Sequence, residues 1–252
     1  MVIVAGLTVA AFVTAVISGM TGLGGGTILV VILYAAGLAP SVAVPVHASV
    51  QLVSNGARLF FFLRHVRWSA LGFFLLTALP APFLVADSLS RVDPNVARVG
   101  MGLFILLVTW TSGLKRWKLH GPGGMVVAGA LAGGLGMVVG ATGTLIAPFF
   151  LRPGWTKETV IGTKALCQAS AHVVKLVAFS TVSFAFGDHL DLIAPMALAV
   201  VGGAYTGKRA VGALSEDTFR RVFRALLTVL ALWLIIRAAL GLGIVPAAAG
   251  LF

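Results

Sequence analysis

Long apolar stretches separated by short polar breaks run along the whole chain. Because these runs are continuous rather than strictly alternating, they favour membrane-spanning helices, of about 20 residues each, over a β-barrel. The pattern predicts helical segments at roughly 2–18, 27–38, 42–63, 69–86, 96–113, 124–139, 144–151, 159–186, 192–207 and 219–241. The segments 27–38 and 144–151 are too short to cross a bilayer alone. We expect them to be half-helices or arms of re-entrant hairpins.

The sequence contains a weak internal repeat. A shift of 117 residues brings equivalent residues into register without a gap: Gly19-Met20 onto Gly136-Met137, Gly26-Thr27 onto Gly143-Thr144, Gln51 onto Gln168, and Arg58 onto Lys175. The C-terminal parts of the two halves match only if about eight residues are inserted, as for a repeat that has diverged. We therefore expect two homologous transmembrane repeats, residues 1–117 and 118–252, within one integrated membrane domain.

The charges between segments predict how the two repeats are oriented. The loop after the third segment is basic in the first repeat (Arg64, Arg67), whereas its counterpart is acidic in the second (Asp188, Asp191). The next loop, 208–224, is strongly basic in the second repeat. Because Lys and Arg prefer the cytoplasmic side, the repeats are expected to be inverted, with both termini outside the cytoplasm. Many secondary transporters have this plan, with the substrate held near the midplane between the repeats.

The composition agrees with a polytopic membrane protein. The chain has 252 residues, of which 59% are hydrophobic and only 10% charged. A soluble domain carries about 25% charged residues, so soluble enzymes, secreted disulfide scaffolds and disordered proteins are excluded. The net charge of +11 is interpreted as cytoplasmic loops rather than as a nucleic-acid surface, and no nucleic-acid partner is expected. The expected fold is all-α, with about 8–10 helical segments, and its surroundings are the lipid bilayer.

The third segment of each repeat carries a polar stripe on one helical face. The stripe residues stand at i, i+4, i+8 and i+11 in both repeats: His47, Gln51, Asn55 and Arg58, then Lys164, Gln168, His172 and Lys175. A charge at the bilayer centre costs about 2.5–3.5 kcal/mol, so the stripes are expected to line a substrate pathway. In antiparallel helices Gln51, Asn55, Gln168 and His172 would lie nearest the middle. Arg58 and Lys175 could instead extend to the membrane interface.

The positions of the acidic residues favour an anion as the substrate. All seven lie in loops or at segment ends, and none is expected beside Lys164 or Lys175 within the membrane. A pathway with Lys, Arg and His but no carboxylate suits a negatively charged solute. His47 and His172 are the stripe groups expected to titrate near neutral pH, which makes them candidates for proton coupling. Each could equally be a neutral histidine that forms hydrogen bonds in the core.

Glycine-rich breaks precede both short segments. The predicted binding residues there are Gly24, Gly25, Gly26 and Thr27 in the first repeat, and Thr142, Gly143 and Thr144 in the second. A helix that begins after such a break directs free N–H groups and a partial positive charge toward an anion. Close helix packing by small residues is the alternative. The first break lacks the Lys of a nucleotide-binding loop, and no metal-ligand cluster or catalytic triad is found, so an enzyme is not expected.

Several of these motifs resemble the sulfite exporter TauE/SafE family of bacterial membrane transporters. The likeness rests on the segment Gly19 to Thr27, on Gly37-Leu38 with Pro40 and Ala43, on Gly136 to Pro148 with Gly162-Thr163, and on Gly202 to Gly207 with Leu214-Ser215 and Arg220-Arg221. It spans nearly the whole chain. The resemblance implies a small sulfur-containing anion as the substrate, such as sulfite or an organosulfonate.

We therefore expect a secondary transporter (a permease or exporter) in the bacterial inner membrane that moves this anion by proton-coupled alternating access. Thr27 and Thr144 would donate hydrogen bonds to the anion, and Gln51 and Gln168 would orient it. Lys164, together with Lys175 or Arg58, would attract it. No cofactor or metal is implied, and the oligomeric state could be a monomer or a homodimer. An anion channel and a membrane scaffold or assembly protein that transports nothing are the alternatives.

Overall fold

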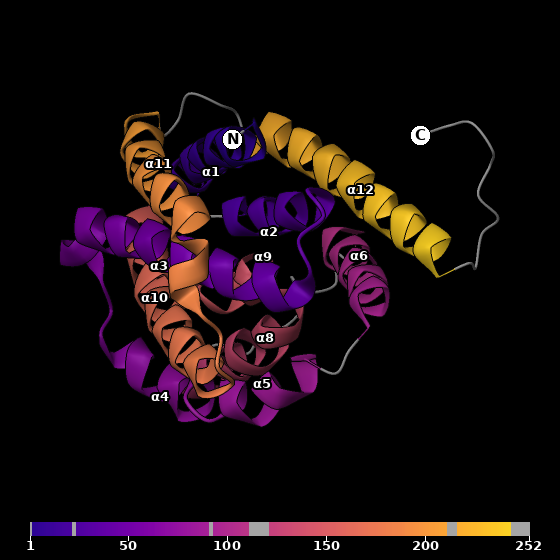
Figure 1. The fold of residues 1–252 in the computed structure, drawn as a ribbon. Helices are drawn as coiled ribbons and strands as arrows, with labels where there is room; N and C mark the ends of the chain where they lie inside the picture. The colour runs from indigo at the N-terminus through magenta and orange to yellow at the C-terminus, as the bar shows by residue number, and fades with distance from the viewer. Residues whose placement is uncertain (1, 22–23, 91–92, 111–120, 211–215, 243–252) are drawn as a thin grey trace.

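The computed structural model describes residues 2–21, 24–90, 93–110, 121–210 and 216–242. Within these ranges the chain forms helices joined by short connections and contains no strand, which confirms the predicted all-α fold (Figure 1). The α-helices are α1 (Val2–Thr21), α2 (Gly25–Ala35), α3 (Pro40–Phe62), α4 (Ser69–Ala78), α5 (Ala81–Ser90), α6 (Pro94–Trp110), α7 (Pro122–Ala130), α8 (Gly136–Val139), α9 (Gly143–Ile146), α10 (Lys157–Thr181), α11 (Leu190–Arg209) and α12 (Glu216–Gly241). Short 3₁₀ or π turns extend or join them: η1 (Leu63–His65), η3 (Leu131–Leu135), η4 (Ala147–Phe149) and η5 (Phe186–His189).

The predicted membrane character is also confirmed. Five stretches among the described residues are long and apolar enough to cross a membrane: Val2–Met20, Ser69–Ala86, Pro122–Val139, Phe186–Arg209 and Arg224–Gly241. Two predicted segments are interrupted. The span 69–86 breaks between α4 and α5 at Pro80, because proline has no N–H to continue the helical hydrogen bonds. The span 124–139 contains the π turn η3.

Both short segments are half-helices, as predicted. The helix α2 has 11 residues and starts after Gly24, whose φ of 78° is a left-handed conformation that glycine adopts without strain. In the second repeat Gly140 has φ of 74° and precedes α9, which continues into η4. Each half-helix therefore begins at a backbone break inside the protein, and its first turn faces inward.

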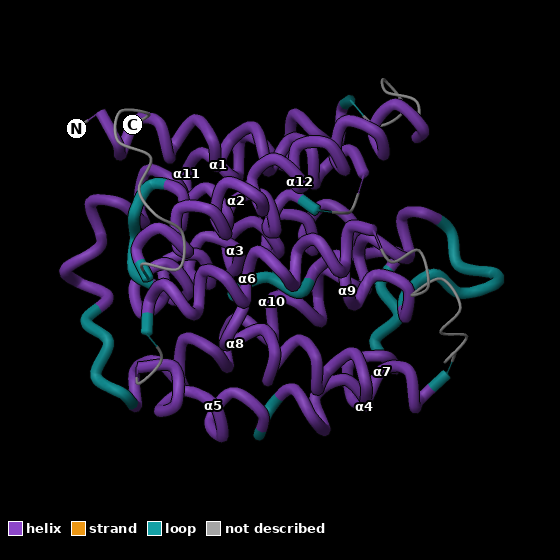
Figure 2. The backbone as a smooth tube through the Cα atoms, turned by 90° about the vertical axis from the view of Figure 1, so that its right-hand side faces the viewer, coloured by secondary structure: helices purple, strands orange, loops and turns teal. Residues whose placement is uncertain are grey.

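The long helices α3 and α10 run antiparallel through the centre of the molecule. Near one end of the pair, a Cβ atom added to Gly162 of α10 would lie 2.9 Å from the carbonyl oxygen of Phe62, at the end of α3. Toward the other end, His47 of α3 meets His172 of α10. Residue numbers therefore rise along one helix and fall along the other. In Figure 2 both helices lie between a layer with α1, α11 and α12 and a layer with α4, α5 and α7.

Glycines allow the first helix of one repeat to pack closely against α11 of the other. A Cβ on Gly203 would collide with the carbonyl oxygen of Phe12, and one on Gly207 would lie 2.9 Å from the Cα of Gly19. The residue numbers of the contacting positions rise together along the two helices, so α1 and α11 are parallel. The backbones approach this closely because the contact positions carry no side chain.

The equivalent pair, α7 and α4, repeats this arrangement. A Cβ on Gly129 would collide with the carbonyl oxygen of Phe74 and lie 2.6 Å from Thr77 Oγ1. One turn later, a Cβ on Gly133 would lie 3.0 Å from Ala81 Cβ. The first helix of each repeat therefore packs in parallel against the fourth segment of the other repeat.

The last helices of the two halves, α6 and α12, are antiparallel. Near one end of the pair Trp110 Nε1 donates to Thr228 Oγ1 at 2.9 Å, and near the other a Cβ on Gly241 would lie 2.9 Å from the Asn95 side chain. Equivalent helices that run antiparallel, here and at α3 and α10, are what inverted repeats produce. The boundary expected at residues 117 and 118 lies outside the described residues.

Candidate substrate site

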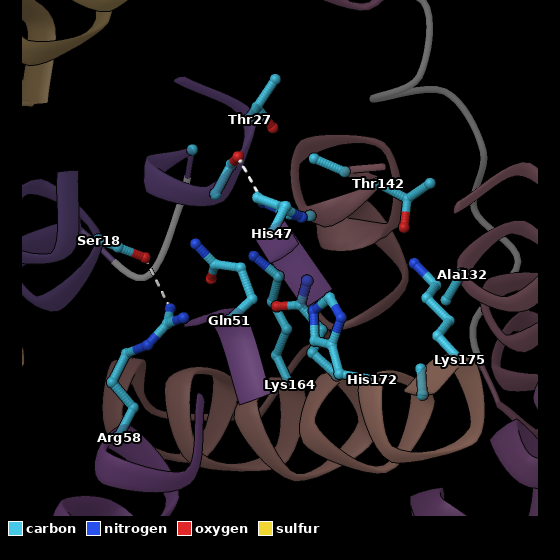
Figure 3. A pocket seen from close by; sticks show the side chains of 16 residues that line it. Ser18, Thr27, His47, Gln51, Arg58, Ala132, Thr142, Lys164, His172 and Lys175 are labelled. Carbon is cyan, nitrogen blue, oxygen red and sulfur yellow. Dashed lines mark hydrogen bonds between the residues drawn. The ribbon is translucent and has the colours of Figure 1, made fainter. Parts of the chain in front are cut away.

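A buried cavity lies where α3, α10 and the two glycine-rich breaks meet (Figure 3). Its volume is about 20 Å³, enough for about one water molecule. Most of the predicted site residues line it: Gly24, Gly26, Thr27, His47, Gln51, Arg58, Thr142, Gly143, Lys164, Gln168, His172 and Lys175. Residues from both halves of the sequence therefore form one site. No Asp or Glu is among the lining residues that the structure describes.

A glycine and a glutamine pack together in the same way in each repeat. A Cβ added to Gly26 would lie 3.1 Å from the Gln51 amide carbon, and one on Gly143 would lie 3.1 Å from Gln168 Nε2. The shift of 117 residues relates both members of the two pairs. The missing side chains allow the two amides to lie against the first turns of α2 and α9. This placement fits the predicted role of Gln51 and Gln168 in orienting a ligand.

The Arg58 guanidinium ties α3 to the end of α1. Its Nη1 donates to Ser18 Oγ at 2.7 Å, its Nη2 donates to Asn55 Oδ1 at 2.8 Å, and its Nε donates to the Ser54 carbonyl oxygen. The arginine is only 5% exposed. Because it is buried and held by these bonds, the guanidinium lies inside the protein and is not exposed at its surface.

Lys175 occupies the equivalent position and makes an equivalent tether. Its Nζ donates to the Gly136 carbonyl oxygen at 3.0 Å, and the side chain is 2% exposed. Position 136 corresponds to Gly19, the neighbour of Ser18 in the sequence. Figure 3 shows Arg58 and Lys175 on opposite sides of the cavity. Each repeat thus anchors its central helix to the helix that precedes its own break.

Three further cavity residues carry side chains that could bind or exchange a proton. Lys164 is 3% exposed and lies in the cavity wall near its centre (Figure 3). His47 Nε2 lies 2.9 Å from the carbonyl oxygen of Gly26, so it is held against the first glycine break. The rings of His47 and His172 lie 6.0 Å apart, centroid to centroid.

Some buried polar atoms at the cavity have no hydrogen-bond partner in the structure. They are Thr27 Oγ1, His47 Nδ1 and His172 Nδ1. All three residues are at most 5% exposed. Buried polar groups are nearly always satisfied by protein, water or a ligand. These atoms are therefore candidates for contacts with water or with a bound solute.

Three predicted site residues do not line this cavity. Gly25 packs against α1, where a Cβ would collide with the Thr14 carbonyl oxygen. Asn55 donates to the Gln51 carbonyl oxygen and accepts from Arg58, so its amide is used within its own helix. Thr144 is half-buried at the start of α9 and lies outside the lining set. In this structure Gly25 serves packing and Asn55 positions Arg58, and a binding role for Gly25, Asn55 and Thr144 stays a prediction.

The cavity also has lining residues that the sequence analysis did not single out. They are Ser18, Ala132, Ala141 and Ala171. Ser18 is the chemically important one, because its hydroxyl accepts from Arg58. The sequence feature that could have identified Ser18 is its position directly before the Gly19-Met20 motif. The alanines leave space, and nothing in their local pattern distinguishes them from ordinary core residues.

The ends of the half-helices that face away from the cavity are held by arginines. At the carbonyl end of α2, Arg237 Nη1 donates to Ala35 O at 3.1 Å and Arg98 Nη2 donates to Gly37 O at 3.4 Å. At the end of η4, Arg152 Nε donates to Phe149 O at 3.2 Å, and partial burial lowers the pKa of the Arg152 guanidinium. Cations suit the negative ends of helices. The arrangement fixes both half-helices with their positive ends toward the cavity.

The described residues contain no group of three or more His, Cys, Asp or Glu that could hold a metal ion. Comparison with known proteins gives one family match. The family model described as sulfite exporter TauE/SafE matches residues 7–234. No curated protein and no solved structure matches the chain. The matched range includes every residue of the cavity.

Proposed function

The chain belongs to the sulfite exporter TauE/SafE family, and from this premise we propose that it carries a small sulfur-containing anion, such as sulfite or an organosulfonate, across the bacterial inner membrane. The observation that carries the proposal is the cavity itself. Its described wall brings together Arg58, Lys164 and Lys175 without any carboxylate. Buried cations of this kind create a site that is selective for anions.

Within this proposal the wall contains binding groups and anchoring groups. Thr27 and the first turn of α2 offer hydrogen-bond donors, and Gln51 and Gln168 offer amides from the two sides. Lys164 provides the attraction nearest the centre. Arg58 and Lys175 add positive potential while they hold the two breaks in place.

The size of the cavity supports alternating access as the transport mechanism. A volume of about 20 Å³ accommodates about one water, whereas sulfite has four heavy atoms. Helices must therefore separate before an anion can enter. Inverted repeats permit this separation on either side by the same relative movement of the two halves.

Proton coupling is proposed to involve His47 and His172. Histidine changes its charge near neutral pH, and both rings lie at the cavity with one nitrogen unpartnered. Uptake of a proton with the anion would reduce the charge that crosses the membrane.

The proposal is tested by flux in proteoliposomes of purified protein. Sulfite and a small organosulfonate are followed with and without a pH gradient, for the wild type and for Lys164→Ala and Gln168→Ala. Lys157→Ala is the matched control, because Lys157 is an exposed lysine at the start of the same helix. We expect saturable, gradient-dependent flux that falls at least about 10-fold in the two cavity variants and is unchanged in the control.

Other outcomes would favour the alternatives. Flux that does not saturate and ignores the gradient would indicate an anion channel. Absence of flux for every anion tested, from protein that elutes as a folded species, would favour a membrane scaffold that transports nothing.

A further inference from the structure

The unpartnered atoms at the cavity differ in what they can accept or donate. The Thr27 hydroxyl can do either, and backbone N–H groups in the first turn of α2 can only donate. The role of an imidazole nitrogen depends on the partner of the other nitrogen in the ring. His47 is the residue for which that partner is defined.

The contact with Gly26 assigns the tautomer of neutral His47. Nε2 lies 2.9 Å from the Gly26 carbonyl oxygen, and a carbonyl oxygen can only accept a hydrogen bond. Nε2 therefore carries the hydrogen. In the neutral ring Nδ1 is then a lone pair, buried and without a hydrogen-bond partner, although the Gly140 carbonyl oxygen also lies near the ring. A ligand that satisfies this atom must donate a hydrogen bond to it.

A fully ionised anion cannot provide that donor. The sulfite dianion and the sulfonate group of an organosulfonate offer only acceptor oxygens, and one of these against the Nδ1 lone pair would be repelled. A monoanion that keeps one acidic hydrogen fits both sides of the site. Its hydroxyl meets His47, and its remaining oxygens meet Thr27 and the first turn of α2.

We propose that this site selects an oxyanion that carries its own proton, such as hydrogensulfite, which donates its hydroxyl to His47 Nδ1. The inference rests on the proposed function, narrows its substrate class, and places the coupled proton on the substrate instead of on His47. The proton then crosses the membrane on the substrate, so His47 recognises the protonated anion and undergoes no net change of charge. Sulfite would be favoured over a simple alkanesulfonate of similar size that has no hydrogen to donate.

The ionisable groups around His47 come from few elements. Lys164, His172 and Lys175 face the cavity from α10, and Arg58 lies further along α3. The helices α8 and α9 carry no Lys, Arg, His, Asp or Glu, and the only ionisable group of α2 is Tyr34, near its other end. The charged neighbours of His47 are thus all cations.

The first test uses only wild-type protein in proteoliposomes with equal pH on both sides. Sulfite uptake is measured across neutral pH, with methanesulfonate as a competitor that has no hydrogen to donate. We expect the apparent affinity for total sulfite to fall ~10-fold per pH unit once hydrogensulfite loses its proton, because only the protonated form binds. Methanesulfonate should compete at least ~10-fold more weakly, because it leaves a buried acceptor unmet.

The second test replaces His47 by Gln. The amide nitrogen of the glutamine side chain can still donate to Gly26 O, but the side chain places no acceptor where Nδ1 of His47 lies. We expect H47Q to lose most of the preference for sulfite over methanesulfonate. His65→Gln is the control, because His65 is an exposed histidine in η1 and should leave the preference unchanged.

The outcomes separate this inference from the proposed function. Equal competition by methanesulfonate in the wild type overturns the inference while the transporter assignment stands. Methanesulfonate binding that strengthens as the pH falls also overturns it, since the proton would then reside on the protein and not on the substrate. Failure of folded wild-type protein to transport either anion instead overturns the proposed function. Because the first test needs no variant, a poorly folded H47Q does not affect the decision.

Discussion

The ring of His172 meets the ring of His47 edge-on, with centroids 6.0 Å apart and planes inclined by 73°. The two histidines are not equivalent in the repeat, since the shift of 117 residues pairs His47 with Lys164 and His172 with Asn55. They meet because α3 and α10 are antiparallel, which brings different stripe positions together where the helices cross. The contact joins the two halves at the cavity.

This contact predicts a variant with opposite effects on stability and transport. His172→Phe keeps an aromatic ring at the crossing but removes the buried Nδ1 that has no partner. We expect unchanged or higher thermal stability, because an unmet buried polar atom costs about 1–3 kcal/mol. Sulfite flux should fall at least about 10-fold.

The control is His189→Phe, because His189 stacks on Phe184 away from the cavity. Melting temperatures in detergent and flux in proteoliposomes measure both effects. Flux at the wild-type level in the His172 variant would show that this histidine is not part of the transport site.

The paired packing of glycine and glutamine predicts a coupling that double mutants can measure. Gly26→Ala places a methyl group 3.1 Å from the Gln51 amide carbon and should displace the amide. We expect the apparent sulfite affinity to fall about 10-fold. Gln51→Asn shortens the side chain and makes space, so the double variant should recover part of the loss.

In a double-mutant cycle, residues in contact show interaction energies of about 0.5–3 kcal/mol. Gly143→Ala with Gln168→Asn is the same experiment in the second repeat. Strictly additive effects in both cycles would show that neither packing contact matters for binding.

Much of this site could be predicted from the sequence, because its residues lie in two copies at fixed spacing. Equal spacings of Gly26 to Gln51 and of Gly143 to Gln168 place equivalent groups on equivalent helices. Helical periodicity then requires each polar stripe to share one face. The half-helices were predictable for the same reason, because their short length and the glycines before them occur twice.

The remaining details depend on contacts between distant segments. The bond from Arg58 to Ser18 joins residues 40 positions apart, and no local pattern reveals it. Asn55 lies on the predicted polar face, yet its amide is used by Arg58 and by its own helix. A stripe shows which residues face the interior but not which of them reach the cavity.

The packing of α11 on α1 predicts contrasting effects for two adjacent glycines. A Cβ on Gly203 would collide with the Phe12 carbonyl oxygen, whereas one on Gly202 would make an ordinary contact of 3.6 Å with the Phe12 ring. Gly203→Ala should therefore destabilise the protein by about 1–3 kcal/mol through overpacking. Gly202→Ala should be neutral or slightly stabilising, because alanine favours the helix. Thermal unfolding in detergent compares the two, and equal melting temperatures would contradict the close approach of α1 and α11.

The tether from Lys175 predicts a variant that affects the second break. A Cβ on Gly136 would collide with the Lys175 ammonium, which donates to the carbonyl oxygen of the same glycine. Gly136→Ala should therefore displace the buried ammonium and loosen the break. Because the tether adjoins the cavity, we expect sulfite flux to fall at least about 10-fold, with a loss of stability of about 1–3 kcal/mol.

Gly134→Ala is the matched control for this variant, because its added Cβ would lie 3.7 Å from the methyl group of Ala81 and would meet no polar group. Lys175→Met is the complementary variant, since it removes the charge and the hydrogen bond while Gly136 stays intact. If the tether acts through the position of the break, Gly136→Ala and Lys175→Met should both reduce the maximal rate of transport. If Lys175 acts only by attracting the anion, Lys175→Met should instead raise the half-saturating sulfite concentration at an unchanged maximal rate. Flux measured across a range of sulfite concentrations therefore separates a positioning lysine from a binding one.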